Sequence, residues 1–144
     1  MIQLYPERAA EALEFDKIRA LLLKKCRTDA AAERVNTLRF HTRLEYLDKE
    51  LQQTHEYKMM LGGGDRFPND FTTNLSKELK LLSIPRAVLA GTQLMDMQKL
   101  ALNMKDILVW FNKHEGLYKH LRAVCDNITY DKRIVELVSS VIDD

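Results

Sequence analysis

Cysteine, glycine and proline are scarce in this 144-residue sequence, which contains 2 Cys, 5 Gly and 3 Pro. So few Gly and Pro, together with 46% hydrophobic and 30% charged residues, exclude a disordered tail and are typical of a globular helical protein. The two cysteines, Cys26 and Cys125, lie far apart in helix-like patterns. This favours buried reduced thiols over a disulfide and points to a reducing compartment.

An excess of either charge is also missing, because 22 basic residues face 21 acidic ones and leave a net charge of +1. The surface as a whole therefore lacks the strong field that would attract nucleic acid or an anionic membrane. The longest apolar runs, such as residues 107–111, are too short to span a bilayer, and residues 1–8 do not resemble a secretion signal. We expect a cytoplasmic protein that does not enter a membrane.

Apolar spacing before Thr42 predicts three short helices. Pro6 suits the first turn of a helix that runs to about Glu14, and Asp16 can open the next one. Thr28 is the expected N-cap of the third. The apolar positions of the second helix recur at the spacing of one helical face; they are Ile18, Leu21, Leu22 and Cys26.

The clearest helix start is Thr42-Arg43-Leu44-Glu45, a capping box in which the hydroxyl and the carboxylate each accept from a backbone amide. A helix of about five turns should follow. Its apolar stripe consists of Leu44, Leu47, Leu51 and Leu61. Gly62-Gly63-Gly64 should end this helix, because glycine adopts left-handed C-cap conformations at little cost. An ordered loop is expected from there to about Asn74, anchored by Phe67 and Phe71.

Four more helices are expected after this loop. One covers residues 75–82, a long one runs from Gly91 to Phe111, one covers residues 117–128, and the last follows an Asp131 cap. No run alternates with the period of a strand. The predicted fold class is all-α, an irregular multi-helix bundle of about six to eight helices with two of them long. Residues 1–144 should form one helical domain, although the loop at 62–74 could separate two packed halves.

Catalytic and metal-binding patterns are missing from the sequence. Gly62-Gly63-Gly64-Asp65 is followed by an arginine and not by the Gly-Lys pair of a phosphate-binding loop. The four histidines, His41, His55, His114 and His120, have neither the mutual spacing nor the cysteine partners of a zinc site. We therefore predict no catalytic, cofactor-binding or metal-binding residue, no enzymatic activity in this chain, and no assignable DNA-contacting residue.

Two groups of residues leave a binding role open. The methionines could line a pliable groove, but core packing is favoured because two of them continue the apolar stripe of the helix from Gly91; the set is Met59, Met60, Met95, Met97 and Met104. The basic clusters fit solvated helix ends better than phosphate contacts; they are Lys24, Lys25 and Arg27, and Lys119, Arg122, Lys132 and Arg133.

A series of short stretches carries a family resemblance through its order along the chain. The stretches are Leu13-Glu14-Phe15-Asp16-Lys17-Ile18, Cys26-Arg27-Thr28, Leu51 and Tyr57 before the glycine-rich loop, Phe67-Pro68, Asp70-Phe71, residues 82–89 before the helix near Leu94, and Ile142-Asp143-Asp144. In this order they resemble the start of the helical core in MutS-type proteins, most closely the second bacterial branch. That branch lacks the mismatch-reading module, and the Phe-x-Glu wedge of that module does not occur here.

The resemblance implies that the chain is an excised fragment of a longer homodimeric ATPase that closes around DNA. The ATP and Mg sites of such a parent lie in Walker motifs downstream of this region. The fragment would be its helical core and lever segment, transmitting nucleotide state to the DNA clamp in mismatch repair or recombination control. Its partners would be the ATPase and clamp domains of the parent, and DNA through the parent.

Two other classes of function stay open at this point. A free-standing helical protein-interaction module would expose a contiguous apolar patch of more than roughly a few hundred Å². A cryptic enzyme would require a pocket in which titratable groups converge.

Overall fold

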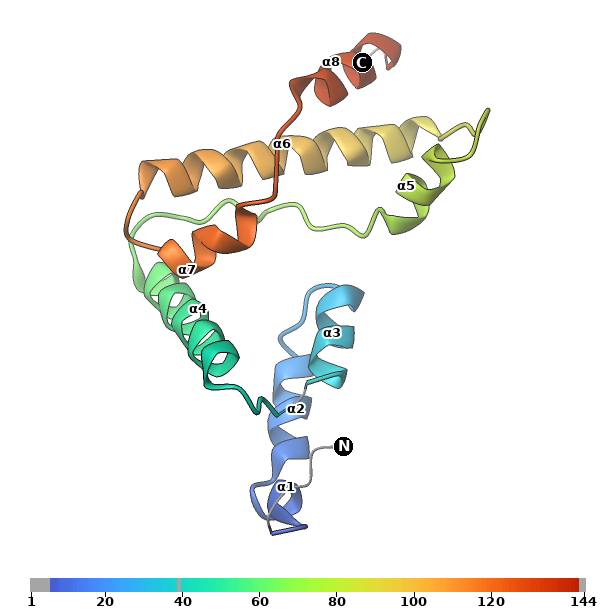
Figure 1. Cartoon of the computed structure of the whole chain (residues 1–144). Helices are drawn as coiled ribbons and strands as arrows, with labels where there is room; N and C mark the ends of the chain where they lie inside the picture. The colour runs from blue at the N-terminus through green and yellow to red at the C-terminus, as the bar shows by residue number, and fades with distance from the viewer. Residues whose placement is uncertain (1–5, 39, 143–144) are drawn as a thin grey trace. The chain divides into compact units, whose positions relative to one another are not determined.

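The computed structural model describes residues 6–38 and 40–142, and those residues form eight α-helices, one 3-10 turn and no strand (Figure 1). This confirms the predicted all-α class. Residues 1–5 and Asp143-Asp144, on which parts of the sequence analysis depend, lie outside the described residues. Backbone contacts divide the chain into two compact units, Met1–Thr42 and Arg43–Asp144. The boundary between them therefore precedes the long helix and does not fall in the loop at 62–74.

The first unit consists of three short helices, as its apolar spacing predicts. They are α1 (Ala9–Ala12), α2 (Phe15–Leu23) and α3 (Asp29–Asn36). Glu14 joins α1 to α2 in the left-handed region, with φ of 53°. Thr28 caps α3, since its Oγ1 accepts a hydrogen bond from the backbone N–H of Ala31 at 3.1 Å. The predicted N-cap is thus confirmed.

The apolar face of α2 is largely exposed. Ile18 is 49% exposed and Leu21 is 62% exposed, and none of the described residues of the first unit is fully buried. Three helices of four to nine residues are too short to enclose a core of their own.

The second unit is built around two long helices, α4 (Leu44–Gly62) and α6 (Gly91–Lys113), which contain 19 and 23 residues. The shorter elements are α5 (Ser76–Leu82), α7 (Lys119–Arg122), the 3-10 turn η1 (Ala123–Cys125) and α8 (Lys132–Val141). The helix predicted over residues 117–128 is therefore too long. The chain tightens there into i→i+3 turns, such as the bond from the Ile128 N–H to the Cys125 carbonyl.

The ends of these helices test the capping predictions. Asp131 caps α8 as predicted, because its side chain accepts from the Arg133 N–H at 3.0 Å. The capping box at Thr42 is wrong: α4 begins at Leu44, so Arg43 takes the N-cap position and makes no side-chain cap. The glycine run does end α4, but not through a left-handed residue, since Gly63 has φ of −73°.

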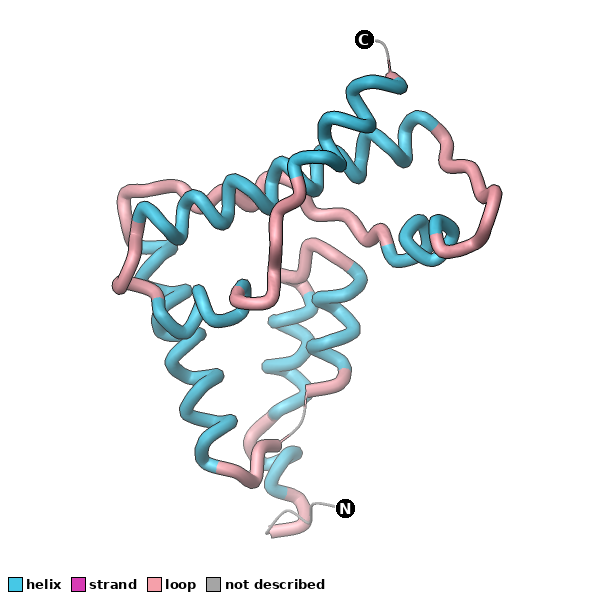
Figure 2. The backbone as a smooth tube through the Cα atoms, turned by 45° about the horizontal axis from the view of Figure 1, so that its top comes forward, coloured by secondary structure: helices cyan, strands magenta, loops and turns pink. Residues whose placement is uncertain are grey.

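The core of the second unit gathers where α6 ends. Trp110 and Phe111 are buried there together with Met60 and Cys125, and Phe67 packs against them. This confirms the predicted anchoring of the loop by Phe67. The loop runs along α6 (Figure 2), where Asn103 donates a hydrogen bond to the Pro68 carbonyl at 2.8 Å.

The leucine stripe of α4 points outward, contrary to the sequence prediction. The exposed fractions are 78% for Leu44, 41% for Leu47, 58% for Leu51 and 67% for Leu61. The opposite side of the helix is buried instead, with Glu56 at 8% and Met60 at 4% exposure. The spacing of the leucines did not predict which side of α4 is buried, because α4 packs against α7 through polar side chains that form hydrogen bonds with α7.

Candidate functional site

The most structured polar region of the second unit lies where α4, the end of α6 and α7 meet. We refer to it as the helix junction; it consists of Glu56, Asp65, Trp110, His114, Tyr118 and His120. Two carboxylate–histidine pairs hold it together, Glu56 with His120 and Asp65 with His114. Each pair joins residues at least 49 positions apart in the sequence, so each one fixes the packing of separate elements.

Glu56 is a carboxylate of α4 that caps the start of α7. Its Oε1 accepts from the backbone N–H and from ring Nδ1 of His120, at 3.1 and 2.8 Å, and its Oε2 accepts from the Leu121 N–H at 2.8 Å. Desolvation by burial acts to raise the pKa of the Glu56 carboxyl, but these hydrogen bonds outweigh it and the pKa is lowered. The Gln53 amide adds a hydrogen bond to the His120 carbonyl at 3.2 Å. α7 is therefore attached to α4 by a charged, ionised cap.

His114, at the end of α6, is held by both of its ring nitrogens. Nδ1 lies 2.8 Å from the Trp110 carbonyl and Nε2 lies 3.0 Å from Asp65 Oδ2. Both partners are acceptors, so the ring can donate to both only when both nitrogens carry protons. The pKa of the Asp65 carboxyl is lowered, first by the hydrogen bond from Lys113 and then by that from His114. Both ring nitrogens are thus engaged, and His114 connects the end of α6 to Asp65 in the loop.

Aromatic rings surround this histidine. Trp110 stacks on the His114 ring with centroids 4.1 Å apart, and Tyr118 stacks on Trp110 at 5.3 Å. Phe67 meets Trp110 edge-on at 5.2 Å. Such pairs add to the stability gained by burial alone. The Trp110 Nε1 is buried without a hydrogen-bond partner, so the indole serves here as an apolar surface.

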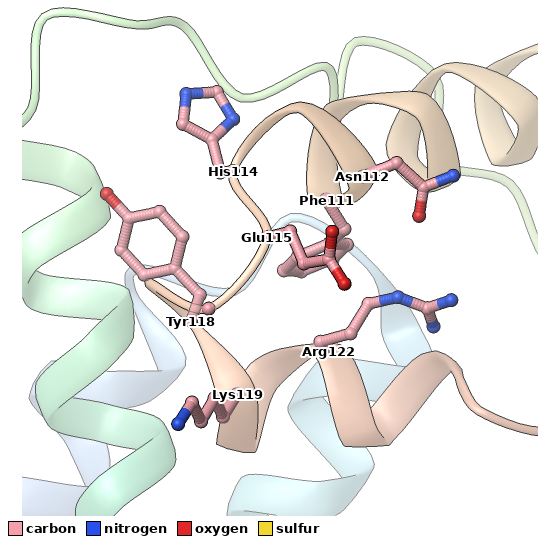
Figure 3. Close-up of a pocket in the computed structure, with 8 residues that line it drawn as sticks. Phe111, Asn112, His114, Glu115, Tyr118, Lys119 and Arg122 are labelled. Atoms are coloured by element: carbon pink, nitrogen blue, oxygen red, sulfur yellow. The ribbon is translucent and has the colours of Figure 1, made fainter.

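A surface pocket of about 390 Å³ opens beside the junction (Figure 3). Figure 3 shows His114 and Tyr118 on one side of it and Asn112, Glu115 and Arg122 on the other. Lys119 also contributes to the lining. The lining contains one carboxylate, Glu115, and two cationic side chains, and the histidine is already held by two acceptors. The pocket offers a mixed polar surface without a preferred ligand charge.

The remaining candidate residues are scattered. His41 lies in the first unit, and His55 is exposed on α4 in the second. Both cysteines are free thiols; Cys125 is buried, and burial raises the pKa of its thiol. Cys26 is only half-buried, and its Sγ donates to the Leu22 carbonyl. Within the described residues, no group of three or more His, Cys, Asp or Glu is arranged to hold a metal ion.

The methionines and basic residues divide between core and surface. Met60 is buried and Met97 and Met104 are half-buried, as core packing predicts, whereas Met59 is 56% exposed. In the looser basic cluster, Lys119 and Arg122 line the pocket, while the other two pair with carboxylates of α8 and its cap. The cluster of Lys24, Lys25 and Arg27 is exposed in the first unit.

Sequence reasoning missed the helix junction. Glu56 stands in a polar stretch of α4, and its partners are 64 and 65 residues away, so no local signal marks it. Among the described helices, none is both long and apolar enough to cross a membrane. No family model, curated protein or solved structure matches this chain.

Proposed function

We propose that this chain is the helical core and lever segment of a MutS-type DNA-binding ATPase, serving DNA mismatch repair or recombination control. The proposal depends on the ordered stretches described above, and their positions on the helices support it. The stretch at 13–18 leads into α2, the glycine run ends α4, and residues 82–89 lead into α6. In this role the chain catalyses no reaction, and ATP and Mg bind elsewhere in the parent protein.

The dimensions of the long helices suit a mechanical role. α6 contains 23 residues and is about 35 Å long, and α4 contains 19 residues and is about 28 Å long. The helix junction clamps α4, the end of α6 and α7 together through buried or stacked side chains. A displacement applied to one of these helices would therefore move the others with it.

The large exposed surface is the observation that best supports a segment covered by further domains. Many of the described apolar side chains are more than half exposed, such as Leu13 at 69%, Val88 at 84% and Leu137 at 66%. In this proposal the ATPase and clamp domains of the parent cover that surface.

The first test is structural and genetic. The reading frame beyond Asp144 should encode a Walker A motif, and a crystal structure of the longer protein should superpose on the core region of MutS-type proteins. A reading frame that ends without a nucleotide-binding motif, or helices that do not superpose, would contradict the proposal.

The second test concerns DNA. With a net charge of +1, the isolated chain can release few counterions and should bind duplex DNA too weakly to measure at physiological salt. Fluorescence anisotropy with a labelled duplex, at low and at physiological salt, measures this directly. Tight and salt-sensitive binding would place a DNA interface on this chain itself and contradict the assignment of DNA contacts to the parent.

The alternative function, a free-standing helical protein-interaction module, is favoured by one observation, the outward leucines of α4. It predicts that the complete natural protein has no ATPase domain and that a foreign helix binds in place of such domains. The same reading frame therefore separates the two proposals.

A further inference from the structure

One face of α4 carries an apolar seam that the rest of the second unit does not cover. We refer to Leu44, Leu47, Leu51 and Leu61 as the leucine face; their exposed fractions range from 41% to 78%. Positions spaced alternately by three and four residues along α4 continue this seam, with Thr54 and Lys58 between Leu51 and Leu61. That spacing is the heptad pattern with which one helix packs along another.

We propose that a second copy of this chain covers the leucine face, with the two α4 helices antiparallel in a two-fold symmetric dimer. In this arrangement Leu44 lies opposite Leu61 of the second copy, and Leu51 opposite Thr54. Leu47 then lies opposite Lys58, whose long stem covers apolar surface while its ammonium group reaches the edge of the seam. The pattern is self-complementary, which a closed two-fold interface requires.

Charge favours the antiparallel arrangement over the parallel one. A parallel pair would place Lys58 directly opposite its own equivalent, and like charges at that distance repel. The antiparallel pair instead brings Asp48, which flanks the seam, close to Lys58 of the second copy. Symmetry creates this pair of opposite charges twice in each dimer, once near each end of the seam.

The length of α4 sets the expected affinity of the dimer. Its 19 residues supply fewer than three heptads, which in isolation is marginal for a two-stranded coil. The helix is already formed and held by the Glu56 cap, so association does not have to order it. We therefore expect a dimer with a dissociation constant on the order of 10 μM.

Sedimentation velocity of the full chain over a concentration series around that value tests the proposal. Leu47→Glu and Leu51→Glu should each weaken dimerisation at least tenfold. Leu102→Glu and Val109→Glu on α6 are matched controls, because those side chains are 39% and 56% exposed and lie outside the leucine face. All four substitutions are at exposed positions, and circular dichroism melts should show the fold retained. A chain that stays monomeric throughout, or equal effects of both pairs, would overturn the proposal.

Charge exchange and cross-linking test the orientation. Asp48→Lys and Lys58→Asp should each weaken the dimer several-fold, and the double variant should recover most of the loss. In a Cys26→Ser background, a Leu44→Cys chain should form a disulfide only when mixed with a Leu61→Cys chain, since Cys125 is buried. Cross-linking of Leu61→Cys chains with one another would show a parallel pair and overturn the antiparallel dimer, as would a double charge variant weaker than either single one.

Discussion

Removal of the Glu56 carboxylate should destabilise the second unit measurably, and the structure allows the size of the effect to be worked out. Glu56→Ala leaves the amides of His120 and Leu121 and the His120 ring without their acceptor. Loss of a helix cap costs about 0.5–2 kcal/mol, and a buried donor left unpaired about 1–3 kcal/mol. Water can reach part of α7, because the His120 side chain is 46% exposed. We therefore expect a loss of about 2 kcal/mol, which corresponds to a fall in Tm of about 8 °C.

The single tryptophan provides the assay. Trp110 is buried at 8% exposure in the core beside the helix junction, so its fluorescence reports unfolding of the second unit. Gln52→Ala on the exposed side of α4 is the matched control, because it introduces the same alanine without removing a buried acceptor. Glu56→Gln should fall between the two, since its amide keeps one acceptor oxygen but turns a donor toward an N–H group.

The stabilisation by Glu56 should depend on pH in a definite direction. The pKa of Glu56 is lower in the folded chain than in the unfolded one, so its stabilisation is complete above the unfolded value of about 4.3. As the pH falls through the folded pKa, the carboxylate is protonated and the stabilisation is lost. The difference in Tm between the wild type and Glu56→Ala should therefore be full at pH 7 and shrink below about pH 4. If the Tm of Glu56→Ala equalled that of Gln52→Ala at pH 7, Glu56 would not stabilise the chain by capping α7.

Three further predictions concern the core and the caps. With a thiol-specific reagent, Cys26 should react in the native chain, whereas Cys125 should react only after denaturation, because it is buried and its pKa is raised. The pKa of Asp131 is lowered to about 2, so its stabilisation of α8 should persist as the pH falls through 4 and be lost near pH 2, as circular dichroism melts can follow. Phe67→Ala should cost about 2–4 kcal/mol and shift the Trp110 emission to longer wavelength, since the half-buried Phe67 ring covers the indole.

The sequence predicted those features of the fold that depend on neighbouring residues. Thr28 and Asp131 cap their helices as expected, because a cap needs only an acceptor two or three residues before an amide. Phe67 anchors the loop as expected, because its large ring packs into the nearby core. The start of α4 was predicted one residue too early, which is enough to take Thr42 out of reach of the amides it was expected to cap.

The features that the sequence did not predict all depend on distant partners. Glu56 is buried because α7 supplies hydrogen-bond donors to it, and the sequence of α4 does not predict these donors. Because this polar side of α4 faces the interior, the leucines on the opposite side face outward. A single unpredicted contact therefore decides which side of the helix is buried. The candidate site was missed for the same reason, since Asp65 and His114 become partners only when the loop folds back along α6.

The two sides of α4 should therefore act independently, and this can be tested in one experiment. Leu47 and Glu56 are nine residues apart, which at about 100° per residue places them on opposite sides of the helix. Glu56→Ala should lower the Tm and yet leave the dissociation constant of the proposed dimer within about twofold, as expected for sites without shared partners. Leu47→Glu should do the reverse. A Glu56→Ala chain that dimerises tenfold more weakly, while still folded at the temperature of the measurement, would mean that α4 needs its attachment to α7 to present the leucine face.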